Sequence, residues 1–223
     1  MKQARLPKSK HLFRKCQHIC LAVFFFLTFQ ETCLAQAHQG TKTLTVAIKG
    51  VFDSKLTVSR YENGAYASPI KEVPNVKDAA IFSIPKDKLP GQFLLRMDYR
   101  EKETDQPYPS EFTFFMSEGD LKIEINPLKT TIDSINFSGN KENPVYYTFM
   151  QEDSRYRQQL ALLEQLLVGY DSPNSSLYKQ AISEFEKRRK KYNQWITTYQ
   201  EENKDLYVSH FFPFQKVPAS NWD

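Results

Sequence analysis

Cysteine and histidine, the side chains that most often serve as nucleophile, base or soft metal ligand, are almost absent from most of this chain. Cys16, Cys20 and Cys33 all precede residue 36, and only His38 and His210 follow it. A chain that starts at residue 36 or 38 can therefore form no disulfide and run no thiol chemistry. A Cys–His dyad is excluded for such a chain, and with only His38 and His210 we expect neither a zinc site nor a Ser–His–Asp triad. We predict no catalytic residue, no cofactor, no metal and no enzymatic activity for the chain as given.

The acidic loop of residues 101–109 is the stretch closest to a binding site for a hard cation. Glu101, Glu103 and Asp105 are three carboxylates within five residues, and carboxylate oxygens suit Ca²⁺. However, this loop has no glycine for the sharp turn of an EF-hand-like site, and Lys102 stands between the carboxylates. We therefore interpret the stretch as a solvated hairpin loop.

A run of five basic residues is the strongest local concentration of charge. One interpretation is a patch for anionic partners such as lipid head groups or an acidic domain. The other is a solvated helix face, because Glu184 precedes Arg188 by four residues and residues 141–223 carry no net charge. The members of this basic run are Lys187, Arg188, Arg189, Lys190 and Lys191.

Residues 1–37 have the pattern of a signal peptide. Six basic residues and one acidic residue fall within residues 1–35, an apolar run spans Ile19–Phe29, and small residues follow at Ala35 and Ala37. The apolar run is shorter than the roughly 20 residues of a membrane span. We expect cleavage after Ala35 or Ala37 and export to the periplasm, with the cell surface as an alternative. Contact with a membrane is expected only through this leader, if it stays uncleaved.

The leader also accounts for the basic character of the whole chain. Residues 1–35 carry a net charge of +5 and the whole chain carries +4, so residues 36–223 carry −1. Binding of nucleic acid, which requires a basic surface, therefore loses its electrostatic support. We expect no nucleic-acid partner.

Residues 38–140 are expected to form an antiparallel β-sandwich or open barrel. Apolar residues alternate with polar ones, as in Leu44–Ile48, and Asn63-Gly64 is a hairpin turn signal. Residues 111–116 are expected to pair with residues 120–126 across a short turn. About seven short strands without intervening helices favour antiparallel pairing.

Residues 141–206 are expected to form a helical hairpin, which makes the fold class α+β. Apolar residues recur at 3–4 spacing in residues 149–167 and again in Ser175–Glu202. Gly139, Asn143 and Pro144 mark the junction between the two patterns. We expect Asn143 to be the N-cap of the first helix and Pro144 its first residue.

The last segment, residues 207–223, is an apolar tail. Phe211, Phe212 and Phe214 would be unfavourable in water. We expect them to fold back onto the hairpin, to form an interface, or to begin a domain that is missing here. Trp195 is a further candidate, because its spacing fits either a core residue or an exposed anchor.

This order of features resembles the N-terminal part of exported thioredoxin-like proteins of Bacteroidota, of the alkyl hydroperoxide reductase/thiol-specific antioxidant type. The residues that carry the resemblance are Leu44–Gly50, Phe114–Ile125 and Phe137–Asn143, followed by Tyr147 and Phe149. The resemblance covers about residues 42–205. It implies a β-rich domain of unknown function and a helical connector, which in that family precede a thioredoxin fold.

The family's chemistry lies in a Trp-Cys-x-x-Cys motif that this sequence does not contain, so no catalytic residue is carried over. The chain is then either a truncated form or a stand-alone relative of the accessory part. The resemblance implies a non-catalytic exported module that dimerises, or that positions or presents a thioredoxin-fold domain or protein. An alternative is a periplasmic or surface β-sandwich that binds a glycan or peptide through Tyr61, Tyr66, Tyr99 and Tyr108. A glycosidase would need two carboxylates set across a cleft, a separation that a sequence does not show.

Overall fold

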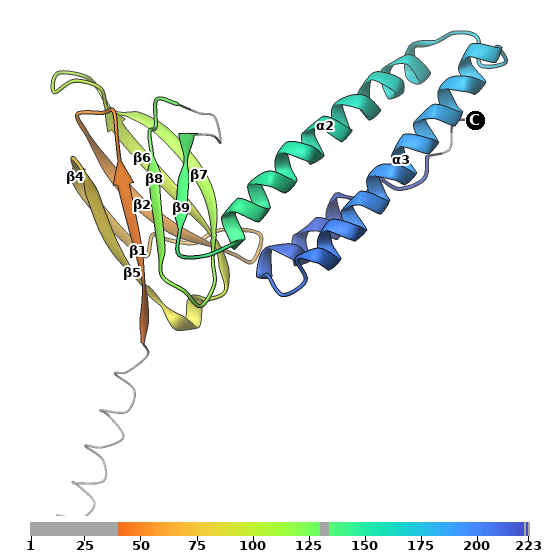
Figure 1. Ribbon diagram of the computed structural model, residues 1–223. Helices are drawn as coiled ribbons and strands as arrows, with labels where there is room; N and C mark the ends of the chain where they lie inside the picture. Colours follow the sequence, from red (N-terminus) through yellow and green to blue (C-terminus); the bar gives the residue numbers. More distant parts are fainter. Residues whose placement is uncertain (1–39, 130–133, 221, 223) are drawn as a thin grey trace, which may run out of the picture. The chain divides into compact units, whose positions relative to one another are not determined.

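The structure is a computed structural model that describes residues 40–129, 134–220 and 222 (Figure 1). Residues 41–223 form one compact unit. The predicted signal peptide, with its three cysteines, and His38 lie outside the described residues. Within the described residues, no helix is long and apolar enough to cross a membrane.

One sheet has the strand order β5-β1-β8-β9. β1 pairs with β5 in antiparallel orientation and with β8 in parallel orientation, and β9 is antiparallel to β8. The inward positions of these strands, such as Leu44 and Phe82, are fully buried. The four strands are β1 (Thr41–Ile48), β5 (Ala79–Pro85), β8 (Leu121–Ile125) and β9 (Asn136–Ser138).

The second sheet has the order β3-β2-β6-β7, with β4 paired to β2. Asn63 and Gly64 form the predicted turn between β2 and β3, and both have positive φ values, 53° and 85°. The strands are β2 (Asp53–Glu62), β3 (Ala65–Tyr66), β4 (Lys71–Val76), β6 (Gly91–Arg100) and β7 (Tyr108–Met116), with a short 3-10 helix η1 (Lys86–Lys88) before β6.

The two sheets share one apolar core, which confirms the predicted α+β class with a β-sandwich. Every second side chain of a strand points to the same face, so alternating residues of both sheets meet in the interior. This core includes Leu44, Val46, Phe82, Ile84, Leu56, Val58, Phe93, Leu95, Phe114 and Ile123.

The predicted hairpin between residues 111–116 and 120–126 is wrong. β7 pairs with β6, whereas β8 lies in the other sheet beside β1, so the chain crosses between sheets at Ser117–Asp120. β8 does not pair with the outer edge of β7, because the main-chain N–H and carbonyl of Phe115 on that edge form hydrogen bonds with the side chain of Asn143, in the following helix. The parallel β1–β8 pair is also an exception to the expected antiparallel pairing.

The helical hairpin is confirmed. It consists of α2 (Glu142–Gly169) and α3 (Ser176–Glu202), followed by a 3-10 helix, η3 (Tyr207–Gln215). The Ser175 hydroxyl caps α3 by accepting a hydrogen bond from the N–H of Tyr178 at 3.1 Å. A second apolar core lies among these helices and includes Phe149, Leu160, Leu167, Phe185, Tyr192, Ile196 and Phe212, with Phe115 contributed by β7.

Candidate functional site

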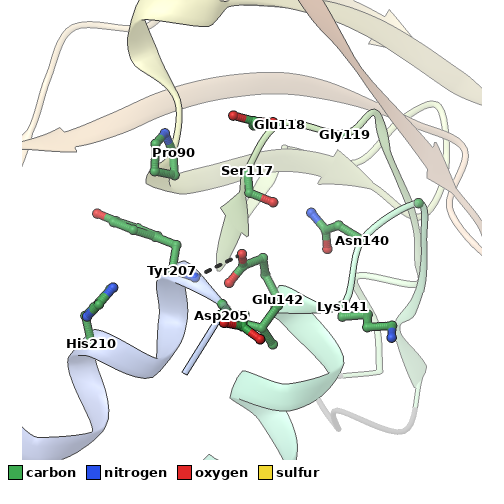
Figure 2. A pocket seen from close by; sticks show the side chains of 12 residues that line it. Pro90, Ser117, Glu118, Gly119, Asn140, Lys141, Glu142, Asp205, Tyr207 and His210 are labelled. Carbon is green, nitrogen blue, oxygen red and sulfur yellow. Dashed lines mark hydrogen bonds between the residues drawn. The ribbon is translucent and has the colours of Figure 1, made fainter. Parts of the chain in front are cut away.

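A cleft of about 560 Å³ lies where the sandwich meets the helices (Figure 2). Four chain segments far apart in sequence form it: the turn before β6, the β7–β8 crossing, the link from β9 to α2, and the start of η3. Its lining includes the ionisable side chains of Glu118, Lys141, Glu142, Asp205 and His210. The lining residues are Pro90, Ser117, Glu118, Gly119, Gly139, Asn140, Lys141, Glu142, Asp205, Leu206, Tyr207 and His210.

Asn143 is not the N-cap of α2, contrary to the prediction. The N-cap is Lys141, which makes no side-chain capping bond, and Asn143 is the second residue of the helix. Its buried amide instead accepts a hydrogen bond from the Phe115 N–H and donates one to the Phe115 carbonyl, both at 2.8 Å. A side-chain amide has one donor and one acceptor face, as the main chain does. Asn143 therefore takes the place of a strand partner on the edge of β7.

Tyr147, one turn further along α2, covers the next position on the same edge. Its hydroxyl donates to the carbonyl of Thr113, two residues before Phe115. Its ring packs against both Phe112 of β7 and Phe137 of β9, with centroids 5.4 and 5.6 Å away, and these two rings also stack on each other. Burial raises the pKa of Tyr147 above its usual range. The first turns of α2 thus close the side of the sandwich between β7 and β9.

The other two predicted junction residues also lie here. Gly139 has φ of 106°, and a side chain at this position would meet the Asp120 carbonyl oxygen. Only glycine fits both the backbone conformation and the close approach. Pro144 is exposed in the first turn of α2, where a missing N–H costs nothing.

Glu142, the first residue of α2, connects the junction to η3. Its carboxylate is buried and accepts hydrogen bonds from the N–H groups of Tyr207, at 3.2 Å, and Val208, at 2.9 Å. These N–H groups begin a helix and have no partner within it. Figure 2 shows Glu142 between the loop that carries Ser117 and the start of η3. The carboxylate is therefore an anchor for η3.

Ser117 and His210 line the same cleft, but they are not coupled. No hydrogen bond joins them among the residues that the structure describes; the recorded ring contact of His210 is with Tyr207, at 6.5 Å between centroids. Within residues 40–129, 134–220 and 222, no group of three His, Cys, Asp or Glu side chains is placed to hold a metal ion. The cleft offers hydrogen-bonding groups to a polar partner and no assembled nucleophile.

The candidate interface residues separate into two kinds. Phe212 is 1% exposed and stacks on Phe149 at 4.1 Å, and Trp195 stacks on the same ring at 5.0 Å. Phe211 packs against Phe115 at 5.5 Å. Phe214, by contrast, is 83% exposed. The fold-back of the tail thus buries Phe212; Phe211 and Trp195 are half-buried, and Phe214 is the one of the four that is fully exposed.

The predicted basic run does not form a uniform patch. Arg188 bonds to Glu184 at 2.7 Å, and Arg189 bonds to Glu186 at 2.7 Å and donates to the Val217 carbonyl at 3.1 Å. Arg189 therefore holds the C-terminal tail against α3. The other three, Lys187, Lys190 and Lys191, are exposed, and Lys187 lies 3.9 Å from Glu184.

The acidic loop of residues 101–109 is a hairpin loop, as predicted. It joins β6 to β7, which pair from Tyr99 and Tyr108 onward. Asp105 accepts from the N–H of Lys102 at 2.9 Å, and Arg100 donates to the carbonyl of Glu103 at 2.9 Å. These bonds order the loop internally.

Two residues of the junction, Glu142 and Tyr147, entered the sequence analysis only through the family resemblance, and no contact was predicted for either of them. A glutamate at the start of a helix signals favourable electrostatics there, but its partner, the start of η3, lies 65 residues away. Tyr147 fits the apolar pattern of α2. Its hydrogen bond to the Thr113 carbonyl depends on where β7 lies in the fold, 34 residues earlier in the chain, and a local sequence pattern does not give that position.

Neither a protein-family model nor a curated protein matches this chain.

Proposed function

We infer that this chain is a non-catalytic exported module that positions or presents a partner, and that the partner is a thioredoxin-fold domain or protein. The observation that carries the proposal is the construction of the junction. Its polar side chains, the buried Asn143 and Glu142 and the half-buried Tyr147, each bond to main-chain groups of another element. Groups used in this way fix elements together, and they are not free to act as acid or base.

A fixed junction suits a positioning role. If α2 and η3 are held to the sandwich by buried bonds, a partner attached to the helices is held as well. The cleft adds exposed Glu118, Lys141, Asp205 and His210 around these bonds. Exposed polar groups around a buried centre are the usual composition of the rim of a protein interface.

The resemblance to exported thioredoxin-like proteins supplies the class of partner. In that family the β-rich and helical parts precede a thioredoxin fold, and the present chain has the same order of strands and helices. The proposal therefore expects a reading frame for a Cys-x-x-Cys thioredoxin fold next to that of this chain, fused or separate.

The experiment is to purify that neighbouring thioredoxin-fold protein and titrate it into this chain by calorimetry. Saturable binding that is weakened at least tenfold by Asp205→Arg or Glu118→Arg in the cleft is expected. The matched control is Asp171→Arg, an exposed acidic position in the turn between α2 and α3. The proposal fails if no such reading frame exists, or if binding is absent or equally sensitive to the control.

A further inference from the structure

The outer face of the sheet β2–β6–β7 carries a second cleft, of about 710 Å³. Alternating residues of these strands, such as Leu56 and Leu95, point into the core, so the intervening residues point outward. The cleft is lined by Asp53, Lys55, Asn75, Arg96, Asp98, Arg100, Asp105, Gln106 and Pro107. None of these residues takes part in the junction described above.

The charged side chains of this cleft are held in place by one another. Arg96 donates to Asp98 at 3.1 Å and to Glu111 at 3.3 Å, and Lys55 lies 3.6 Å from Asp98. Arg100 forms a two-pronged pair with Asp53, which is buried. A planar guanidinium or carboxylate fixed in this way presents its remaining donors and acceptors in a defined direction.

The charge of the cleft indicates what it can bind. Three carboxylates, from Asp53, Asp98 and Asp105, face three cations, from Lys55, Arg96 and Arg100. A surface with no net charge does not concentrate a polyanion or polycation. The surface does offer adjacent donors and acceptors, which match the adjacent hydroxyl groups of a neutral sugar, because each hydroxyl both donates and accepts.

An aromatic pair lies on the same outer face, toward the other end of β6. Tyr61 and Tyr66 meet edge to face at 5.2 Å and are 41% and 38% exposed. The Tyr66 hydroxyl is fixed by Gln92, at 3.3 Å, and by Thr113, at 3.1 Å. A fixed, half-exposed ring provides an apolar platform beside a polar group, which suits the C–H face of a pyranose ring.

Tyr99 and Tyr108 do not join this platform. Their ring centroids are 6.2 Å apart. Tyr99 lies two residues after the buried Met97 on β6, so it points to the same, core-side face, and Tyr108 is its cross-strand partner on that face. The four tyrosines named as candidates from the sequence therefore lie on two different faces of the sheet. Tyr61 and Tyr66 remain on the outer face with the charged cleft.

We propose that this outer face binds a neutral oligosaccharide, with one end stacked on Tyr61 and Tyr66 and the other hydrogen-bonded in the cleft at Arg96 and Asp98. Residues 92–98 of β6 run between the two ends. Six steps of a strand span about 20 Å at ~3.4 Å per residue, a length that accommodates about four pyranose units. The face is thus an additional site beside the junction; the two meet at Thr113, whose hydroxyl bonds to Tyr66 and whose carbonyl accepts from Tyr147.

The test is calorimetric titration of the protein with four neutral hexasaccharides: maltohexaose, cellohexaose, xylohexaose and mannohexaose. At least one is expected to bind saturably. Arg96→Ala and Tyr66→Ala should each weaken that binding at least tenfold. Arg155→Ala, which removes another exposed, ion-paired arginine on α2, should leave it within twofold.

Circular dichroism and thermal unfolding establish that each variant is folded. The proposal is overturned if none of the four sugars binds at about 10 mM, or if binding persists unchanged in both Arg96→Ala and Tyr66→Ala. To cover loss of folding in Tyr66→Ala, Tyr66→Phe keeps the ring and removes the hydroxyl that Gln92 and Thr113 fix. It should weaken binding less than Arg96→Ala does; an equal loss contradicts the stacking role.

Discussion

The side-chain amide of Asn143 on α2 bonds to both main-chain groups of Phe115 on β7, at 2.8 Å to the nitrogen and 2.8 Å to the oxygen. Two residues earlier, the Thr113 carbonyl of the same edge receives the hydroxyl of Tyr147. A strand edge with unpaired main-chain groups is normally a place where another strand adds. Here a helix occupies that edge, so the edge becomes the attachment point of the hairpin.

Asn143→Ala should lower the free energy of unfolding by about 3 kcal/mol. The substitution leaves the buried N–H of Phe115 without a partner and leaves its carbonyl only the longer hydrogen bond from Asn140, at 3.3 Å. Each lost hydrogen bond to a buried group costs about 1–3 kcal/mol. Urea unfolding measures the change. Asn174→Ala, in the exposed turn before α3, is the matched control and should change stability by less than about 0.5 kcal/mol. Equal effects of the two substitutions would contradict the role of Asn143.

Glu142→Gln should lower the free energy of unfolding by about 1–2 kcal/mol. A carboxylate accepts from both Tyr207 and Val208, whereas an amide turns its NH₂ group toward one of these N–H groups. Glu118→Gln makes the same chemical change at an exposed position of the cleft and should be neutral. Hydrogen exchange adds a local measure: the N–H groups of Tyr207 and Val208 should exchange faster in Glu142→Gln alone.

Phe212→Ala should lower the free energy of unfolding much more than Phe214→Ala does. Phe212 stacks on Phe149 within the helical core, and truncating a buried Phe costs about 3–5 kcal/mol. Phe214 is exposed, so its truncation should change stability by less than about 0.5 kcal/mol. Chemical unfolding of both variants measures this contrast. A large loss of stability in Phe214→Ala would show that its ring is buried in the protein in solution.

Glu124 should titrate well below the ordinary pKa of a glutamate, 4.5. Hydrogen bonds from Lys122 and Lys49 lower its pKa from the ordinary 4.5 to about 2. A lowered pKa means that the group adds stability above pH 4.5, and that this contribution is lost as the pH falls toward 2. The side-chain carboxyl shift in NMR measures the titration directly. In Glu124→Gln, stability should fall less steeply over that interval; an unshifted midpoint near 4.5 would refute the prediction.

The sequence alone predicted what depends on local pattern. Alternation located most strands, Asn63-Gly64 located a turn, and 3–4 spacing located both helices, because each depends on near neighbours. β4 was not predicted, because Lys71, Glu72 and Pro74 break its alternation and the strand lies at a sheet edge.

The errors concern residues whose partners lie far away in sequence. Asn143-Pro144 has the local signature of a helix start, but the helix begins two residues earlier, with Lys141 as the N-cap and Glu142 as the first residue. The role of Asn143 was wrong because its partner, Phe115, is 28 residues away. The expected β7–β8 hairpin failed for the same reason, since the competitor for the β7 edge is a helix.

Tyr192→Phe should lower the free energy of unfolding by about 1–2 kcal/mol at neutral pH. The Tyr192 hydroxyl donates to buried Asp153, which Arg157 also contacts at 3.0 Å. The substitution removes one of the two partners of this carboxylate. Tyr108→Phe, at an exposed tyrosine, is the matched control and should be neutral.

The effect of Tyr192→Phe should also depend on pH. Burial, and then the bond to Asp153, raise the pKa of Tyr192 above the ordinary 10.0. A group with a raised pKa contributes its full stability below pH 10 and loses it above, because the unfolded tyrosine ionises first. The stability difference between the native protein and Tyr192→Phe, measured by urea unfolding, should therefore shrink between pH 10 and pH 11. A difference that stays constant across this interval would mean that Tyr192 ionises equally in both states, which its burial beside Asp153 does not allow.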